Sequence, residues 1–265
     1  MLAATSAYAK PSNPAFLGIG MRDLQGQSAT SGVVLGPCMV ESVTRGSGAK
    51  EAGLLPGDML ISIDGTPVPS CDAVQRVIQA RQPGDTVRIA LRRYGRPLSL
   101  EATLVSRDEI LRRRLVGQPI GATDVWAVDQ QRFVDLGALR GKLAIVGWFD
   151  RSCDGCAQVF SRIASWSREQ GDRLPVPAVP LAVTIGEPGP RDPSVPALEV
   201  PLALAAPGVY EEFTIPDRER IHFIVVDPRG VVQYATPVAP KGDDAAAVLD
   251  ELFAAAEQAA RRATR

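Results

Sequence analysis

Two cysteines three positions apart, Cys153 and Cys156, stand between a short apolar run and a segment with helical spacing. The run, residues 143–146, predicts a buried strand. Apolar residues recur three, four and seven positions after Cys156, as on the buried face of a helix. A C-x-x-C pair between a strand and a helix is typical of a redox-active dithiol. This feature constrains the fold most, because it requires a strand, a tight turn and a helix in that order.

The same spacing predicts different environments for the two sulfurs. Cys156 falls on the buried stripe of the expected helix, and Cys153, one turn earlier, is expected to point outward. A sulfur in the first helical turn lies near the positive end of the helix dipole, which favours thiolate over thiol. We therefore predict that Cys153 attacks and Cys156 resolves in disulfide exchange.

The pair has two other interpretations. Half of a zinc site is one, but the chain has no second C-x-x-C pair, and its single histidine, His222, stands alone in an apolar run. A purely structural local disulfide, or an inert pair, is the other, and the sequence leaves it open. We expect no metal and no cofactor besides a redox-active Cys153–Cys156 disulfide.

Composition limits the broad class of the protein. The length of 265 residues suits two domains, and 45% apolar with 22% charged residues describes a globular chain with ample core. A net charge of −1 indicates neither a nucleic-acid partner nor a charged membrane surface. No apolar run approaches the roughly 20 residues that cross a bilayer, so the sequence predicts no transmembrane segment.

Residues 1–13 are expected to be a leader. Ala7-Tyr8-Ala9 has the small-x-small form of a signal-peptidase site and precedes Lys10. No basic start and no full apolar region accompany it. The stretch is therefore the remnant of a signal peptide or a chance alanine-rich leader. The first interpretation favours the periplasm or cell envelope, and the second leaves the cytoplasm as the alternative.

Residues 14–107 carry a long motif from Arg45 to Gly65, which reads RGSGAKEAGLLPGDMLISIDG. It resembles the PDZ domain appended to bacterial HtrA-like proteases, and the resemblance covers the whole segment. It implies a small β-barrel of α+β type. The residues indicate strands at 39–43, 86–92 and 98–104 and a helix at 72–81, and Asp64-Gly65 is a hairpin signal.

The PDZ resemblance implies a peptide groove between the strand 19–21 and the helix 72–81. A partner's C-terminus would pair there as an extra strand, with its carboxylate bound by backbone N–H groups around residues 17–19. Ordinary core packing is the alternative for the apolar members. No trypsin-like triad is possible with one histidine after this domain. The predicted peptide-binding residues are Phe16, Leu17, Gly18, Ile19, Met21, Val74 and Ile78.

Cys38 and Cys71 stand in the same segment, before a strand and before the groove helix. We expect two buried free thiols, with pairing as the alternative in an exported protein. Residues 108–116 follow as a charged and helical linker, in which a run of arginines forms a solvated face.

From residue 117 to 262 the chain resembles the AhpC/TSA (redoxin), TlpA-like branch of the thioredoxin superfamily. Gly117-Gln118-Pro119 opens the match, and Leu139-Arg140-Gly141-Lys142 precedes the central strand. The resemblance implies an α/β fold, a central mixed sheet flanked by helices. The expected strands are 124–128, 133–136, 143–146, 181–185, an edge segment at 200–205, 221–226 and 231–234, and the closing helix is 243–260.

This sequence departs from that family in three places. The family's cis-proline would fall at Ile221, and the nearest proline is Pro216, so either an insertion follows a retained proline or the proline is lost. The family's buried acid is replaced by Gly147. Ser152 stands before the first cysteine, where relatives often carry tryptophan. The Pro-x-x-x-Thr-x-x-Cys loop of peroxidases is also missing around Cys153.

The sequence thus predicts a thiol–disulfide oxidoreductase of protein disulfides, in which the PDZ domain recruits substrate or partner C-termini. The implied partners are a protein with a free C-terminus and a thiol–disulfide electron donor or acceptor. A redox-inactive adaptor built from the same two folds is one alternative function. A peroxiredoxin-like peroxidase is another.

Overall fold

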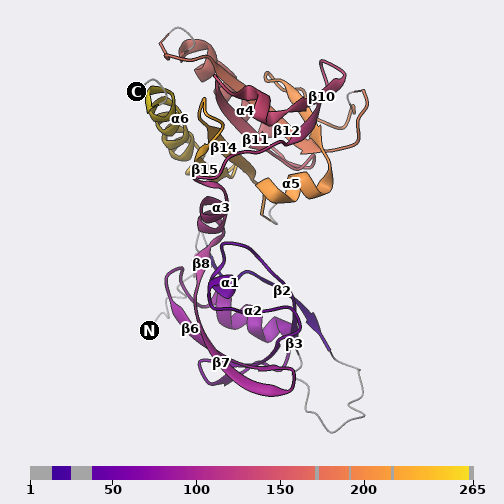
Figure 1. Cartoon of the computed structure of the whole chain (residues 1–265), viewed down its shortest axis with the longest axis vertical. Coiled ribbons are helices and arrows are strands. Elements are labelled where there is room, and N and C mark those ends of the chain that lie inside the picture. Colours follow the sequence, from indigo (N-terminus) through magenta and orange to yellow (C-terminus); the bar gives the residue numbers. More distant parts are fainter. Residues whose placement is uncertain (1–13, 25–37, 171–172, 191, 216–217, 263–265) are drawn as a thin grey trace, which may run out of the picture. The chain divides into compact units, whose positions relative to one another are not determined.

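The computed structural model describes residues 14–24, 38–170, 173–190, 192–215 and 218–262 (Figure 1). The chain divides into two compact units between Ile110 and Leu111. This division falls inside helix α3 (Arg107–Leu115), which occupies the segment predicted as a charged linker. The predicted leader and Pro216 lie outside the described residues.

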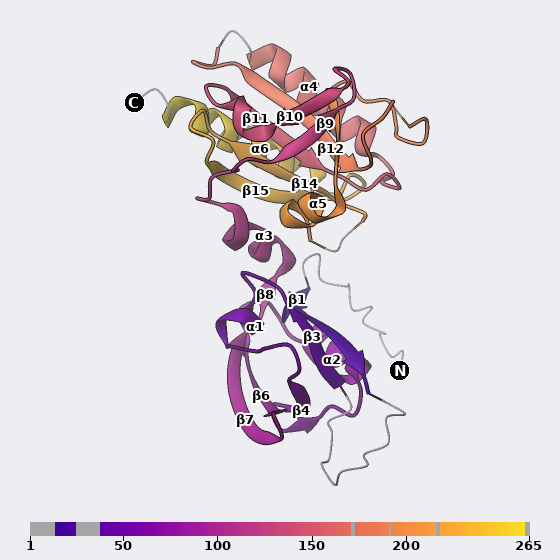
Figure 2. The same cartoon turned by 45° about the vertical axis from the view of Figure 1, so that its right-hand side comes forward.

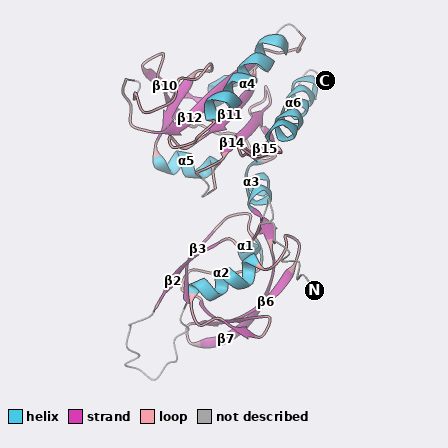
Figure 3. Ribbon diagram, turned by 180° about the vertical axis from the view of Figure 1, so that it is seen from behind, coloured by secondary structure: helices cyan, strands magenta, loops and turns pink. Residues whose placement is uncertain are grey.

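The first unit is a strongly bent antiparallel sheet with one long helix (Figure 3). Its main sheet has the order β2-β3-β4-β6-β7, β5 pairs with β4, and β1 pairs separately with β8. The predicted α+β class is confirmed. The elements are β1 (Ala15–Phe16), β2 (Ile19–Asp23), β3 (Cys38–Val43), α1 (Gly48–Glu51), β4 (Met59–Ile63), β5 (Thr66–Pro67), α2 (Cys71–Gln79), β6 (Thr86–Arg93), β7 (Arg96–Thr103) and β8 (Val105–Ser106).

Local sequence signals explain two of these elements. Asp64 and Gly65 both have positive φ, 49° and 77°, as the tightest hairpin turns require, and they join β4 to β5. Ser70 caps α2 by accepting a hydrogen bond from the Ala73 N–H group at 3.2 Å. The predicted helix at 72–81 therefore exists, but it begins at Cys71 and ends at Gln79.

The second unit is built on a seven-stranded mixed sheet of order β10-β9-β13-β12-β11-β14-β15. β11 and β12 pair in parallel, as do β12 and β13, while β14 runs antiparallel to β11. The elements are β9 (Asp124–Ala127), β10 (Arg132–Asp135), the 3-10 turn η1 (Leu136–Leu139), β11 (Leu143–Trp148), α4 (Cys156–Gln170), β12 (Ala178–Ile185), β13 (Leu202–Ala205), α5 (Pro207–Phe213), β14 (Ile221–Val226), β15 (Val232–Val238) and α6 (Ala245–Arg262).

Helices cover both faces of this sheet (Figure 2). Leu143 and Ile145 of β11 pack in the core that contains residues of α4 and α6. Ala144 and Val146, which point to the opposite face, pack in the core that contains residues of α5. Side chains alternate between the faces along a strand, so both faces of β11 are buried and its sequence is continuously apolar. The unit has a thioredoxin-like fold, as predicted.

One expectation for this sheet is wrong. The segment 200–205 forms β13, which is not an edge strand: it pairs with β12 on one side and with β9 on the other. The partner β9 comes from a distant part of the sequence, so no local pattern around β13 indicated that its outer side would be covered. Helix α5, which opens with Pro207, was not predicted either.

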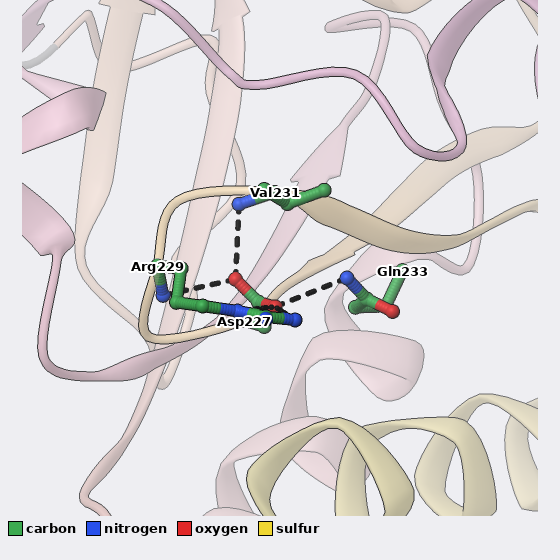
Figure 4. Close-up of polar contacts among 4 residues, drawn as sticks. All are labelled: Asp227, Arg229, Val231 and Gln233. Atoms are coloured by element: carbon green, nitrogen blue, oxygen red, sulfur yellow. Dashed lines mark hydrogen bonds and ion pairs between the residues drawn. The ribbon is translucent and has the colours of Figure 1, made fainter. Parts of the chain in front are cut away.

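The predicted hairpin after β14 is confirmed, and Asp227 fixes its turn (Figure 4). The Asp227 side chain is buried, and its carboxylate accepts hydrogen bonds from the backbone N–H groups of Arg229 at 2.9 Å and Val231 at 3.0 Å. The guanidinium of Arg229 and the amide of Gln233 donate to its second oxygen. A buried carboxylate with this many hydrogen-bond donors has a structural role, because it stabilises the turn.

Among the described helices, none combines the length and apolar character of a membrane span.

Candidate functional site

The first candidate site lies where β11 meets α4. A disulfide joins Cys153 to Cys156, whose Cα atoms are 5.8 Å apart. Cys156 is the first residue of α4, and Cys153 lies in the preceding loop rather than in the first helical turn, which corrects the sequence expectation. The reason is Gly155, whose φ of +87° ends the loop in a conformation that a helix cannot contain.

The two sulfurs have the predicted difference in exposure. Cys156 is 1% exposed and shares the α4 core with Val159, Phe160 and Ile163, the residues predicted to form its stripe. Cys153 is half-buried. An accessible sulfur joined to a sheltered one is the arrangement that disulfide exchange requires. The catalytic roles of the two cysteines stay predictions.

The two acids that flank Cys153, Asp150 and Asp154, contact hydrogen-bond donors or cations. Asp150 accepts hydrogen bonds from the Ser152 backbone at 2.9 Å and hydroxyl at 2.6 Å, and Arg218 lies 3.8 Å from its other oxygen. Partial burial raises the pKa of Asp150, but the Ser152 hydrogen bonds and the nearby arginines outweigh it, so the pKa lies below the ordinary value. Asp154 forms an ion pair with Lys241. Each carboxylate that flanks Cys153 therefore lies next to a cation.

The position of the family's buried acid has no space for any side chain. A Cβ atom on Gly147 would lie 2.5 Å from the Phe223 ring and 2.7 Å from the Phe160 ring. These two rings pack edge to face with their centroids 5.7 Å apart, in the core that also contains Cys156. A proton acceptor from β11 is thus replaced by aromatic packing. Ile221, the position counted for the cis-proline, is the first residue of β14, and the described residues contain no cis peptide bond.

His222 is buried on the opposite face of the sheet from α4. Its pairing partner in β11 is Trp148, which stacks on Phe213 of α5 at 4.6 Å. Neither ring nitrogen of His222 has a hydrogen-bond partner in the described part of the chain. Burial, reinforced by the charges of Arg220 and Arg114, lowers the pKa of His222 to about 3. The ring is therefore neutral at physiological pH.

The second candidate site is a cavity of about 220 Å³ in the first unit, between β2 and α2. All seven residues predicted for the peptide groove line it. Its other lining residues, which sequence reasoning missed, are Pro14, Ala15, Gln75, Gln79 and Arg107. Arg107 opens α3 and lies with its guanidinium 5.3 Å from the centre of the Phe16 ring. The pairing of β1 with β8 brings these two residues together, and nothing in the local sequence indicates that pairing.

The backbone at one end of the groove has the polarity that a carboxylate needs. The carbonyls of Leu17 and Gly18 accept from the N–H groups of Ala49 at 3.0 Å and Thr44 at 2.9 Å. Within the described residues, the N–H groups of Leu17 and Gly18 have no acceptor. Gly18 has a φ of +84°, which turns the chain between β1 and β2. β2 is an edge strand of its sheet, so its outer side is available for pairing.

The sequence analysis predicted that Cys38 and Cys71 are free thiols. This prediction is wrong, because the two residues form a disulfide. The bend of the sheet places their Cα atoms 4.9 Å apart although 33 positions separate them, and this approach is tertiary rather than local. Asp23, the register partner of Cys38, accepts a hydrogen bond from the Cys71 N–H group at 2.7 Å. The ligand atoms of Asp23, Cys38 and Cys71 lie within 4.8 Å of one another. With both sulfurs bonded to each other, no thiolate is available for a metal there.

Comparisons with known proteins identify the first unit. Residues 15–104 match the family model of the PDZ domain, and this segment is a PDZ domain. A protein of Mesorhizobium japonicum named as a zinc metalloprotease is 33% identical over 98 residues, which are 36% of this chain and 26% of that protein. The periplasmic pH-dependent serine endoprotease DegQ of Escherichia coli is 38% identical over 65 residues, 24% of this chain and 14% of DegQ. The chain thus spans about a quarter or less of these two relatives.

Solved structures resemble each unit separately. The PDZ domain of HtrA3 bound to a phage-derived ligand has a TM-score of 0.32 with 20% identity, covering 36% of this chain and 88% of that one. The thioredoxin domain of a thiol-disulfide oxidoreductase from Bacteroides vulgatus has a TM-score of 0.40 with 18% identity, covering 52% of this chain and 97% of that one. Both similarities concern less than the full chain.

Proposed function

We propose that this protein is a thiol–disulfide oxidoreductase of the redoxin, TlpA-like type, acting on protein disulfides in the bacterial cell envelope. The observation that carries the proposal is the Cys153–Cys156 disulfide, which joins a half-buried sulfur to a buried one at the carboxyl end of the central strand. The exchange uses the cysteine pair alone and requires no cofactor. A cell-envelope location is supported by the second disulfide, because such bonds persist in oxidising compartments.

The proposed exchange proceeds in two balanced steps. The reduced protein attacks a substrate disulfide through the Cys153 thiolate, which forms a mixed disulfide and releases one substrate thiolate. Cys156 then attacks the Cys153 sulfur, which re-forms the Cys153–Cys156 bond and releases the second substrate thiolate. The substrate gains two electrons and the pair loses two, so an external dithiol must reduce the pair for another cycle. In the opposite direction the disulfide form oxidises a substrate dithiol.

The surroundings support this assignment of roles. Attack needs access, and Cys153 is the more exposed sulfur of the pair. The N-terminus of α4 lies beside the disulfide because Cys156 is its first residue, and its positive end favours thiolate. Pairing of Asp150 and Asp154 with Arg218 and Lys241 limits the repulsion that these acids would exert on a thiolate.

The PDZ unit would recruit substrates or partners by their C-termini. Its groove combines an edge strand, an apolar wall on α2 and two N–H groups without acceptors. An extended peptide would add to β2, and its carboxylate would accept from the N–H groups of Leu17 and Gly18. Tethering gives the cysteine pair an effective substrate concentration on the order of millimolar for a short linker.

A reduction assay tests the proposal. The full chain with dithiothreitol should accelerate the reduction of insulin, and Cys153→Ser should lose that acceleration. The matched variant Cys156→Ser should accumulate mixed disulfides through Cys153, detectable by mass spectrometry. Should the wild type and Cys153→Ser prove equally inert while both are folded, the redox-inactive adaptor is correct. The aromatic filling at Gly147 is the specific observation that favours that second function.

A further inference from the structure

A cleft of about 720 Å³ opens beside the loop that carries Cys153. It lies at the carboxyl ends of the parallel strands β11, β12 and β13, and β9 and β10 complete its wall. Asp150 and Arg151, which follow β11, contribute the side nearest the cysteine pair. Sheets of α/β proteins bind their ligands in crevices outside the carboxyl ends of strands. The cleft therefore lies at the edge of the sheet where α/β proteins commonly bind ligands, and it is distinct from the PDZ groove.

The floor and one wall of this cleft are apolar and partly exposed. Phe133 is 57% exposed and Ile185 36% exposed, which is unusual for residues of this size on strands. The ring of Trp126 packs edge to face against Phe133 at 5.2 Å. Leu204, Pro188 and Pro207 continue the apolar lining. Exposed aromatic surface inside a concave site fits an apolar or aromatic side chain of a ligand.

Hydrogen bonds hold the opposite wall in place. Arg151 donates from Nε and Nη2 to the carbonyl of Ile185 at 2.9 Å and 2.7 Å, and from Nη1 to Asp192 at 2.5 Å. The Trp126 indole N–H donates to the carbonyl of Gly189 at 2.9 Å. A Cβ atom on Gly186 would lie 2.7 Å from Arg151 Nη2, so a side chain there would displace the end of the arginine. The proline-rich segment after β12 is thereby anchored to β9 and to the Cys153 loop, so the cleft exists before any ligand binds.

The described lining residues include three acids and one arginine, and Arg218 lies 3.8 Å from one of the acids, Asp150. Asp124, Asp150 and Glu187 face the cleft, and Asp150 is ionised. Among the described residues that line the cleft, Arg151 is the only cation, and its guanidinium is already paired with Asp192. At the floor, Thr184 is 1% exposed, and its hydroxyl has no hydrogen-bond partner in the described part of the chain. The cleft therefore complements a ligand with a cation and a polar backbone or side-chain group.

We infer that this cleft binds the residues next to the disulfide in an extended peptide substrate, with an aromatic side chain adjacent to a lysine or arginine. The aromatic ring contacts Trp126 and Phe133, and the cation lies near Asp124 and Glu187. The inference rests on the proposed function, because it names the substrate class of the Cys153–Cys156 pair. It assigns specificity to a surface separate from the C-terminal recognition of the PDZ unit.

A binding experiment tests the cleft without requiring any reaction. Two fluorescent peptides of equal length carry a central S-methylated cysteine and a C-terminal amide, which removes the carboxylate that the PDZ groove would bind. One places Phe-Lys beside the cysteine and the other places Ser-Glu. The full chain in its disulfide form should bind the Phe-Lys peptide at least about tenfold more tightly by fluorescence anisotropy. Equal affinity for the two peptides would overturn the inference.

Matched variants locate the site. Phe133→Ser and Asp124→Asn should each reduce the preference for the Phe-Lys peptide. Tyr94→Ser, another exposed aromatic residue, and Asp129→Asn, an exposed acid outside the lining, should leave it unchanged. A loss of preference in the controls, or none in the cleft variants, contradicts the placement.

A second assay separates this inference from the proposed function. The reduced chain carrying Cys38→Ala and Cys71→Ala is mixed with 5,5′-dithiobis(2-nitrobenzoate), a small disulfide that does not need the cleft. Release of thionitrobenzoate together with equal binding of the two peptides refutes the cleft and supports the proposed function. Selective peptide binding with Cys153 and Cys156 inert towards every disulfide supports the cleft as a peptide site and refutes the proposed function.

Discussion

The two disulfides of this protein are alike in exposure and different in connectivity. Each pairs a buried cysteine, Cys38 or Cys156, with a half-buried one, and each includes the first residue of a helix. The bond in the PDZ unit joins residues 33 positions apart and ties β3 to α2, whereas the bond in the thioredoxin-like unit spans three positions. Exposure alone therefore does not distinguish Cys153–Cys156, the pair that we propose to be reactive, from Cys38–Cys71.

Charge distinguishes the two bonds further. The carboxylate of Asp23 lies within 4.8 Å of both sulfurs of the Cys38–Cys71 pair, and no cation partner for Asp23 is found among the described residues. A neighbouring negative charge disfavours thiolate. Near Cys153, by contrast, Asp150 and Asp154 are each paired with a cation. The comparison indicates that local connectivity and balanced charge make one pair suited to exchange, while the other pair holds two elements together.

The largest effect is expected on exchange itself. Cys153→Ser should lower the rate of insulin reduction by at least about 10³-fold, because it removes the attacking sulfur. The double variant Cys38→Ala with Cys71→Ala should keep the exchange reaction. Equal losses in the two variants would mean that the disulfides do not have separate roles.

The free energy of unfolding should depend more on the Cys38–Cys71 bond than on the Cys153–Cys156 bond, the reverse of the order expected for exchange. Loop closure in the unfolded chain predicts that removing Cys38–Cys71 costs about 4 kcal/mol and removing Cys153–Cys156 about 2 kcal/mol. Urea titrations of the paired alanine variants, with fluorescence of the three tryptophans for the second unit and circular dichroism for the whole chain, measure both losses. A larger cost for the three-position bond would contradict the structural role of Cys38–Cys71.

Acid should destabilise only the thioredoxin-like unit through histidine. The folded pKa of His222, about 3, lies below the value of about 6.5 in an unfolded chain. The unfolded state therefore binds a proton that the folded state does not, and stability present above pH 7 is lost as the pH falls from about 6.5 towards 3. Between pH 7 and pH 5 the loss is about 2 kcal/mol.

His222→Leu is the variant that isolates this effect. Denaturant midpoints measured from pH 7 to pH 5 should fall more steeply in the wild type than in His222→Leu. The PDZ unit contains no histidine, since the chain has only one, so its midpoint supplies the internal reference. Parallel slopes in the wild type and the variant would show that another group controls the acid response.

The elements of both units were predictable where the determinant is local. The hairpin turn at Asp64-Gly65, the run that forms β14 and the stripe of α4 each carry their own signal within a few residues. The Cys38–Cys71 bond, the burial of β13 between β9 and β12, and the cleft at Arg151 depend instead on contacts between segments far apart in sequence. The start of α4 was misplaced because Gly155 takes a positive φ, a choice that the pattern of apolar residues does not encode.

The smallest expected effect concerns the PDZ groove, which shares α2 with Cys71. Peptides with a free apolar C-terminus should bind the full chain at micromolar affinity or weaker, because adding one strand buries little area and must offset the ordering of the peptide. Amidation of the peptide should weaken binding about tenfold by removing charge-assisted hydrogen bonds to the N–H groups of Leu17 and Gly18. Isothermal titration with the free and amidated forms measures the difference.

Substitutions on α2 sharpen this last prediction. Ile78 is 6% exposed and lines the groove, so Ile78→Gln should weaken binding of the free peptide by a similar factor, while Arg76→Gln, on the exposed side of the same helix, should not. Because a polar group at a buried position also destabilises the fold, thermal unfolding of Ile78→Gln must show a folded domain at the assay temperature. The comparison of free and amidated peptides uses the wild-type chain. It therefore tests the groove even if Ile78→Gln does not fold. Equal affinity for free and amidated peptides would mean that the N–H groups at the end of the groove do not bind a carboxylate, and that the PDZ unit recruits its partners by another surface.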